Sequence, residues 1–220
     1  GTKLFILQHG LQGLNPSSGI FFCEQRFSDK YLTWGHKNAD NIKSSPLFCT
    51  TTIAKKIVKK IKKDILLSYT EFYLKPGKCM PLPRTGDETD IYKNDIIDLL
   101  SFLIKDSKKK IYLKYNTQRG NNNITNQIKQ RFKKLSFIKT NLNKRGYEFS
   151  NEFRLNIETT NSTGFIELLS LNVPVILITN KKFFDVKKEY KKYFDGLIKS
   201  NIIFFDTKKA SDFIKLNINN

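Results

Sequence analysis

The sequence predicts an α/β protein built on a Rossmann-like parallel sheet with helices on both faces. Short apolar runs alternate along the chain with longer segments in which apolar residues recur at helical spacing. The apolar runs are continuous, which is typical of strands that are buried on both faces. Because a strand, a helix and the next strand form a right-handed crossover between parallel strands, this repeated order favours a parallel sheet.

The composition indicates a folded chain in a reducing, cytoplasmic setting. At 220 residues, with 39% hydrophobic residues that include 18 Phe and 9 Tyr, the chain can bury the core of one large domain, or of one domain and part of a second. Cys23, Cys49 and Cys79 show neither disulfide-framework nor zinc-site spacing. No apolar run reaches about 18 residues, so we expect no membrane span. Because Gly1 leads almost directly into a strand, we expect the chain to be a fragment.

The formal net charge is +19, and the proportion of Lys to Arg indicates which anionic partner the chain could bind. The chain has 33 Lys, 6 Arg and 20 Asn. Recognition of nucleic acid favours the bidentate guanidinium group of Arg, so we do not expect nucleic acid to be the partner. A modest affinity for an anionic membrane surface is expected as a secondary property, which would place the protein peripherally at the inner membrane face.

The first predicted elements are short. The run Lys3–Leu7 predicts a buried strand that ends in Gln8-His9-Gly10 and is followed by a loop rich in Gly, Asn, Pro and Ser. The segment Phe27–Gly35 predicts a second short strand, closed by Gly35. The segment Ile53–Lys63 places apolar residues at helical spacing among lysines, which predicts an amphipathic surface helix.

From Asp64 the order becomes regular. Asp64–Tyr69 predicts a strand, Pro76–Thr89 a loop, and Asp90 the N-cap of a helix. The apolar stripe of that helix comprises Ile96, Leu99, Leu100 and Leu103. The next predicted elements are the strand Ile111–Tyr115, the Asn-rich loop Asn116–Asn123, and a helix marked by Ile124, Ile128, Phe132 and Leu135.

The same alternation continues to the C-terminus. Phe153–Ile157 predicts a strand, Thr159–Thr163 a polar turn, Phe165–Leu171 a helix and Val173–Thr179 a β-branched strand. The remaining predictions are a helix marked by Val186, Tyr190, Phe194, Leu197 and Ile198, the strand Ile202–Phe205, and the helix Thr207–Leu216.

The turn before the helix Phe165–Leu171 is the strongest candidate for a ligand site, because doubly wound sheets bind ligands beyond the carboxyl ends of their strands. Ser162 and Thr163 place hydroxyl groups where a helix begins, and the exposed N–H groups and dipole of a helix N-terminus favour phosphate. The alternative interpretation is ordinary N-capping by these side chains. Glu167, about one turn into this helix, is expected to meet a polar group such as a ribose hydroxyl.

Other candidates lie at the ends of two further strands. His9 is a candidate general base or hydrogen-bond donor to a phosphoryl oxygen, the alternative being a loop histidine that bonds only backbone. Gly10 permits close approach of the backbone to a ligand. Lys114, with Arg119 in the following loop, can neutralise a phosphate. Arg84 is a weak candidate for a phosphate contact, and His36 is given no role. The sequence lacks GxGxxG, GxxxxGK[ST] and HExxH, which disfavours dinucleotide, P-loop and zincin chemistry.

Two groups of residues, taken together, resemble a known family. The first is Gln8-His9-Gly10 with Ser28–Gly35, and the second is Thr160–Glu167 with Asn172–Ile176. They resemble bacterial surface-carbohydrate-biosynthesis transferases of GT-B type related to CDP-glycerol glycerophosphotransferases. In that family a His-Gly turn lies near the end of the N-terminal lobe and an SDxxxTWG-like connector follows. A Ser-Ser or Ser-Thr turn in the C-terminal lobe holds the donor's phosphates.

The resemblance implies a role for each matching residue. His9 would be the catalytic or phosphate-contacting histidine, Ser162 and Thr163 the phosphate cradle, and Glu167 the partner of the nucleotide ribose. Lys114 matches a position that is often basic in the family. Residues 1–45 would be the end of an N-terminal lobe and residues 46–220 the nucleotide-donor-binding lobe. The chain departs from the family in its short glycine stretch after the histidine and in lacking most of an acceptor-binding lobe.

The implied function is transfer of a glycosyl or glycerophosphate group from a CMP-, CDP- or UDP-linked donor, without an obligatory metal or other cofactor. The implied acceptor is a surface glycan or a lipid-linked sugar. Two alternatives stay open. One is a non-catalytic basic module that binds an anionic polymer or a nucleotide, and the other is a degenerate transferase that binds a nucleotide without turnover.

Overall fold

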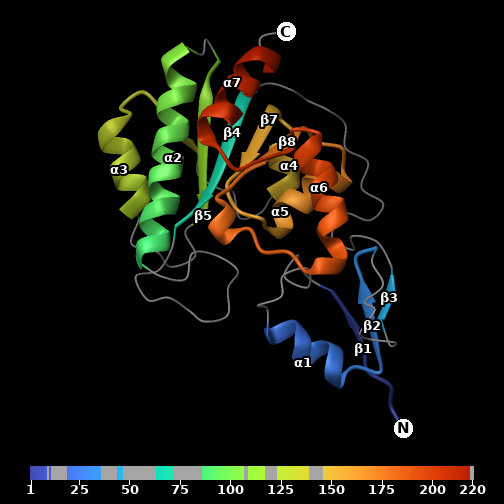
Figure 1. The fold of residues 1–220 in the computed structure, drawn as a ribbon. Coiled ribbons are helices and arrows are strands. Elements are labelled where there is room, and N and C mark those ends of the chain that lie inside the picture. Colours follow the sequence, from blue (N-terminus) through green and yellow to red (C-terminus); the bar gives the residue numbers. More distant parts are fainter. Residues whose placement is uncertain are drawn as a thin grey trace.

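The computed structural model describes residues 1–8, 10, 19–35, 44–46, 63–71, 86–106, 109–116, 123–138 and 146–218. The described strands form two parallel sheets, one of three strands and one of six. Figure 1 shows the larger sheet between layers of helices, and the smaller one formed by the N-terminal part of the chain. The predicted α/β class with a Rossmann-like parallel sheet is confirmed.

The six-stranded sheet has the doubly wound strand order. Across the sheet the order is β6 (Ser136–Ile138), β5 (Ile111–Asn116), β4 (Lys63–Thr70), β7 (Phe153–Glu158), β8 (Val175–Ile178) and β9 (Ile203–Phe204), and every neighbouring pair is parallel. The chain starts in the centre at β4, runs outward to β6, and returns to the centre at β7. The order therefore reverses between β4 and β7, and ligands of such sheets bind beyond the carboxyl ends of the strands at this switch point.

Helices cover both faces of this sheet (Figure 1). Ile176 and Ile178 of β8 belong to the core shared with α2 (Gly86–Asp106), α3 (Asn123–Arg131) and α7 (Thr207–Ile218). Val175 and Leu177 of the same strand belong to a second core, with α4 (Gly146–Ser150), α5 (Thr163–Ser170) and α6 (Lys191–Lys199). Because successive side chains of a strand point to opposite faces, continuous apolar strands supply both cores. Short 3₁₀ helices span Lys181–Phe183 and Lys188–Tyr190.

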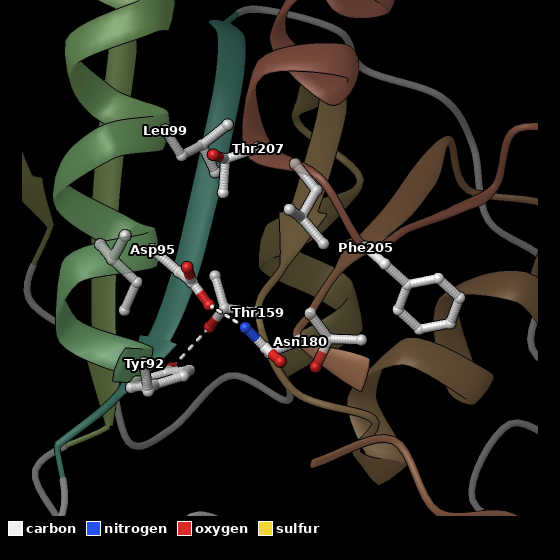
Figure 2. A pocket seen from close by; sticks show the side chains of 10 residues that line it. Tyr92, Asp95, Leu99, Thr159, Asn180, Phe205 and Thr207 are labelled. Carbon is white, nitrogen blue, oxygen red and sulfur yellow. Dashed lines mark hydrogen bonds between the residues drawn. The ribbon is translucent and has the colours of Figure 1, made fainter. Parts of the chain in front are cut away.

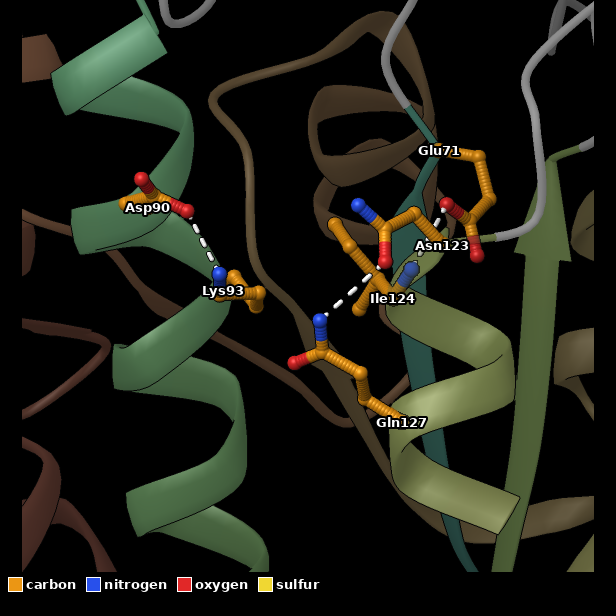
Figure 3. Close-up of polar contacts among 6 residues, drawn as sticks. All are labelled: Glu71, Asp90, Lys93, Asn123, Ile124 and Gln127. Carbon is orange, nitrogen blue, oxygen red and sulfur yellow. Dashed lines mark hydrogen bonds and ion pairs between the residues drawn. The ribbon is translucent and has the colours of Figure 1, made fainter. Parts of the chain in front are cut away.

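The helix α2 begins earlier than the sequence analysis predicts. It starts at Gly86. Asp87 and Glu88 lie in its first turn, where the positive end of the helix dipole stabilises carboxylates. Asp90 is therefore inside the helix and is not its N-cap; its carboxylate pairs with Lys93 at 2.5 Å (Figure 3). The predicted stripe is confirmed, because Ile96, Leu99, Leu100 and Leu103 are all buried.

The helix α3 is shorter than the predicted helix and is capped from the neighbouring strand. The backbone amides of Ile124 and Thr125 donate to the buried carboxylate of Glu71, which follows β4 (Figure 3). Phe132 and Leu135 lie beyond the last helical residue, although both pack against the core. The short elements β6 and α4 are not predicted by the sequence analysis.

The helix α5 is followed, after its C-cap residue Leu171, by a residue with left-handed backbone conformation. Asn172 has a φ of 53°, and the amide of Val173 donates to the carbonyl of Leu168. The amide of Asn172 itself donates to the carbonyl of Leu169. This arrangement satisfies the last carbonyls of the helix and turns the chain directly towards β8.

The small sheet has the order β1 (Phe5–Leu7), β2 (Lys30–Thr33) and β3 (Ser44–Pro46), with α1 (Gly19–Phe27) between β1 and β2. The two predicted strands are present but shorter, whereas α1 and β3 are not predicted. The prediction that the first strand is buried is wrong: β1 lies at the edge of the small sheet, and the side chains of Phe5 and Leu7 are 53% and 47% exposed. Gly35, with a φ of 81°, closes β2 in a conformation that favours glycine. The predicted helix Ile53–Lys63 lies outside the described residues except Lys63, which opens β4. None of the described helices combines the length and apolar character needed to cross a bilayer.

Candidate functional site

The turn before α5 presents hydroxyl groups at a helix N-terminus. Ser162 occupies the N-cap position with extended backbone, φ −118° and ψ 168°, but its side chain makes no capping hydrogen bond. Ser162 is therefore the N-cap residue by position, as the alternative interpretation expects, but its hydroxyl does not cap the helix. Its hydroxyl stays beside the start of the helix, because a Cβ on Gly164 would lie 3.7 Å from Ser162 Oγ. The first N–H groups of a helix have no intrahelical acceptors, so this position suits an anion.

Gly10 lies directly against this turn. A Cβ placed on Gly10 would be 3.1 Å from Thr163 Oγ1, closer than side-chain contacts normally permit. The end of β1 is thus in contact with the start of α5, although the two segments are far apart in sequence. The side chain of Gln8, which is 1% exposed, fixes the backbone here: Nε2 donates to the Gly10 carbonyl at 2.7 Å, and Oε1 accepts from the Trp34 amide at 2.9 Å.

A row of polar side chains crosses the switch point at the carboxyl edge of the large sheet. Ser68 of β4 is in register with Lys114 of β5 on one side and with Glu158 of β7 on the other. Residues in register on parallel strands point to the same face, and these three face α4 and α5 because their neighbours Leu113, Leu67 and Ile157 belong to the opposite core. A Cβ on Gly146, the first residue of α4, would lie 3.6 Å from Lys114 Nζ.

Glu158 is the carboxyl group of this row, and its pKa is strongly shifted. Its burial raises its pKa to about 7, and the negative charge of Glu167 on α5 adds to the rise, whereas Lys114 and the hydroxyl of Ser68 oppose it. Lys114 and Glu167 therefore both act on the same carboxyl group. A partly buried carboxyl that titrates near neutral pH, at the carboxyl ends of the strands, is typical of a functional site.

The opposite face of the switch point is held by a tyrosine on α2. The hydroxyl of Tyr92 lies 2.6 Å from Thr159 Oγ1, which in turn donates to the carbonyl of Ser68 at 3.0 Å. The amide of Thr70 donates to the same tyrosine oxygen at 3.1 Å. Burial raises the pKa of Tyr92, so it remains a neutral phenol. These bonds tie β4, β7 and α2 together where the turn before α5 begins.

A small pocket, partly open to solvent, adjoins this tyrosine between α2 and α7 (Figure 2). Its polar wall is formed by Asp95 and Asn180, whose amide donates to Asp95 Oδ2 at 3.1 Å. Burial raises the pKa of Asp95; Asn180 opposes this rise and Asp98 adds to it. Thr159 lines the pocket as well. The pocket therefore shares one residue with the turn that precedes α5.

Most predicted site residues that the structure describes fall into two groups. Gly10 lies against Thr163 beside Ser162. Lys114 and Glu167 interact electrostatically with Glu158, and no direct contact among these three side chains is implied. The predicted roles of these residues are not tested by the geometry alone. His9 and Arg119 lie outside the described residues, as do the weaker candidates His36 and Arg84.

Ser68, Tyr92, Asp95 and Glu158 belong to this region but were not predicted as site residues from the sequence. A signal for Glu158 does exist in the sequence, because a glutamate ends an otherwise apolar strand directly before the polar turn. Ser68 and Tyr92 carry no comparable signal. Within the described ranges no group of three or more His, Cys, Asp or Glu side chains could hold a metal ion. Cys23 is exposed and its thiol is free.

Comparison with known protein families decides the class of the protein. The model of the LIC12162 family transferases matches residues 1–220, which is the whole chain. The chain belongs to the LIC12162 family of transferases. It is therefore an enzyme of the transferase class with a Rossmann-like α/β fold. A comparison with curated proteins gives no match for this transferase.

Proposed function

We propose that this transferase moves a glycosyl or glycerophosphate group from a nucleotide-activated donor to an acceptor in surface polysaccharide biosynthesis. The observation that carries the proposal is the contact between Gly10 and Thr163 Oγ1, where a Cβ would approach to 3.1 Å. This contact joins the two segments that resemble GT-B transferases related to CDP-glycerol glycerophosphotransferases. A donor bound at the turn before α5 would thus lie next to the residue that follows His9.

The proposed donor site neutralises a diphosphate without a metal ion. The N-terminus of α5 offers N–H groups, Ser162 offers a hydroxyl that makes no capping bond, and Lys114 brings a cation to the same edge of the sheet. Preorganised donors of this kind stabilise the charge that develops on a leaving diphosphate. Arg119 is proposed as a further cation, Glu167 as the partner of the ribose hydroxyls, and His9 as the catalytic base for the acceptor hydroxyl.

The two sheets suggest how the proposed GT-B architecture maps onto the chain. We assign the small sheet to the end of an N-terminal lobe, residues 1–45, and the large sheet to the donor-binding lobe, residues 46–220. The predicted boundary falls within β3 (Ser44–Pro46). The proposed setting is the cytoplasmic face of the inner membrane, because the net charge of +19 favours an anionic surface and the acceptor is proposed to be a glycan or a lipid-linked sugar.

The test is calorimetric binding of CMP, CDP, UDP and GDP to the wild type and to Ser162→Ala at two salt concentrations. We expect one nucleotide to bind selectively, and Ser162→Ala to weaken its binding roughly 10- to 150-fold, since a hydrogen bond to a charged group contributes ~1.5–3 kcal/mol. Ser200→Ala is the matched control, because Ser200 is exposed at the end of α6. Binding that ignores the base and disappears with salt would instead indicate a basic module for anionic polymers.

A further inference from the structure

The polar row at the switch point contains a charge conflict that the proposed donor site leaves unexplained. Lys114 and Glu158 flank Ser68 on adjacent strands, and Glu167 acts on Glu158 from α5. Thr163 and Glu167 are four residues apart in α5, so they lie on the same side of that helix. Two carboxyl groups therefore stand close to a turn that is proposed to hold a diphosphate, which also carries negative charge.

Such an arrangement is unfavourable unless one carboxyl is neutral. Glu158 is the group whose surroundings favour the neutral form, because it is partly buried and faces the carboxylate of Glu167. The other described groups that act on it are Lys114 from β5, Ser68 from β4, and the neutral hydroxyl of Tyr92 from α2. Lys114 is the cation among these, and it cannot fully neutralise both an ionised Glu158 and a bound phosphate.

We propose that Glu158 is a proton-exchanging positioning residue: it takes up a proton when a donor diphosphate occupies the turn before α5, and so releases Lys114 to the phosphate. The inference rests on the proposed function and deepens it, since it assigns a role to a residue outside the predicted site. In the empty site Glu158 is ionised above about pH 7, and Lys114 then compensates its charge. In the occupied site the negative phosphate raises the proton affinity of Glu158, and Lys114 compensates the phosphate instead.

Proton linkage gives the sign and the size of the expected pH dependence of donor affinity. The pKa of Glu158 is about 7 in the free protein and is higher in the complex, so donor affinity falls as the pH rises above 7. Uptake of one proton limits the slope to about tenfold per pH unit, so the affinity falls by up to about 30-fold between pH 6.0 and pH 8.5. In Glu158→Gln this loss should disappear, because the amide cannot exchange a proton in this range.

The experiment is titration calorimetry with UDP-glucose, GDP-mannose and CDP-glycerol between pH 6.0 and 8.5, repeated in two buffers of different ionisation enthalpy. These diphosphate diesters have no phosphate ionisation near neutral pH, so protons counted in the titration come from the protein. We expect proton uptake on binding to the wild type and none in Glu158→Gln. Glu148→Gln is the control, since it removes an exposed carboxylate from α4 and should leave the uptake unchanged.

Two further measurements separate this inference from the proposed function. Carbon-13 NMR of glutamate-labelled free protein should show one carboxyl that titrates near pH 7, and this signal should be absent in Glu158→Gln. A pKa of Glu158 near the ordinary 4.5 would overturn this inference but not the proposed function. Lys114→Met should raise the pH above which donor affinity begins to fall, because Lys114 lowers the pKa of Glu158 in the wild type. Donor binding without proton uptake in the wild type overturns the inference and leaves the function standing. No binding of any donor overturns both.

Discussion

The close contact between Gly10 and Thr163 leads to a sharp prediction for Gly10→Ala. The added Cβ would lie 3.1 Å from Thr163 Oγ1, so this hydroxyl must move by a few tenths of an ångström, either by rotation of the threonine side chain or with the start of α5. Overpacking of this kind costs ~1–3 kcal/mol. Because the backbone at Gly10 is not in the left-handed region, the penalty comes from this contact rather than from the conformation of alanine.

We expect this cost to appear in nucleotide binding, because the displaced threonine belongs to the proposed phosphate cradle. A displacement worth ~1–3 kcal/mol corresponds to a roughly five- to 150-fold loss of affinity. The assay is calorimetric titration with the nucleotide that the wild type binds, together with thermal unfolding. Gly196→Ala is the matched control, because nothing lies within 4 Å of the Cβ that it adds to α6. Wild-type affinity and wild-type Tm in Gly10→Ala would refute the contact between these segments.

Three further variants test other parts of the site. Tyr92→Phe removes the hydroxyl that bonds Thr159 and the Thr70 amide, and urea unfolding should show a loss of ~1–3 kcal/mol; no loss would mean that these bonds do not hold the switch point. Glu71→Ala removes the cap of α3 and should cost ~1–2 kcal/mol, seen as early loss of amide-exchange protection in α3 but not in α7. Glu158→Gln should change the pH dependence of stability. The pKa of this carboxyl rises from 4.5 to about 7 on folding, so the free energy of unfolding of the wild type falls by about 3 kcal/mol as the pH rises through that window. Equal pH slopes of stability in the variant and the wild type would contradict this.

The sequence was most informative where local composition alone determines the element. Apolar runs identified β4, β5, β7 and β8, because strands buried on both faces are mainly apolar, even though three of them carry a polar residue near the carboxyl end. The short elements α1, β3, β6 and α4 were missed, since a few residues carry too little periodicity to separate them from loops. The start of α2 was placed too late because Asp90 resembles a cap, although acidic residues also favour the first turn of a helix.

The candidate site was only partly predictable for a different reason. Ser162, Thr163 and Glu167 are neighbours in sequence, so the turn and its helix can be recognised locally. The row formed by Lys114, Ser68 and Glu158 depends on the register of three strands, which is fixed by contacts between distant segments. The contact of Gly10 with Thr163 joins two sheets and has no local signature.

The left-handed Asn172 at the end of α5 has a consequence for how this family can vary in length. Asn172 and the buried strand β8 fix the C-terminal end of a helix of only 8 residues. A residue inserted into α5 can therefore be absorbed only at the other end. Each such residue would rotate the start of the helix by about 100° and carry Ser162 and Thr163 away from Gly10. We therefore expect transferases that share this turn to keep the spacing between Thr163 and Asn172 constant, and to place insertions elsewhere.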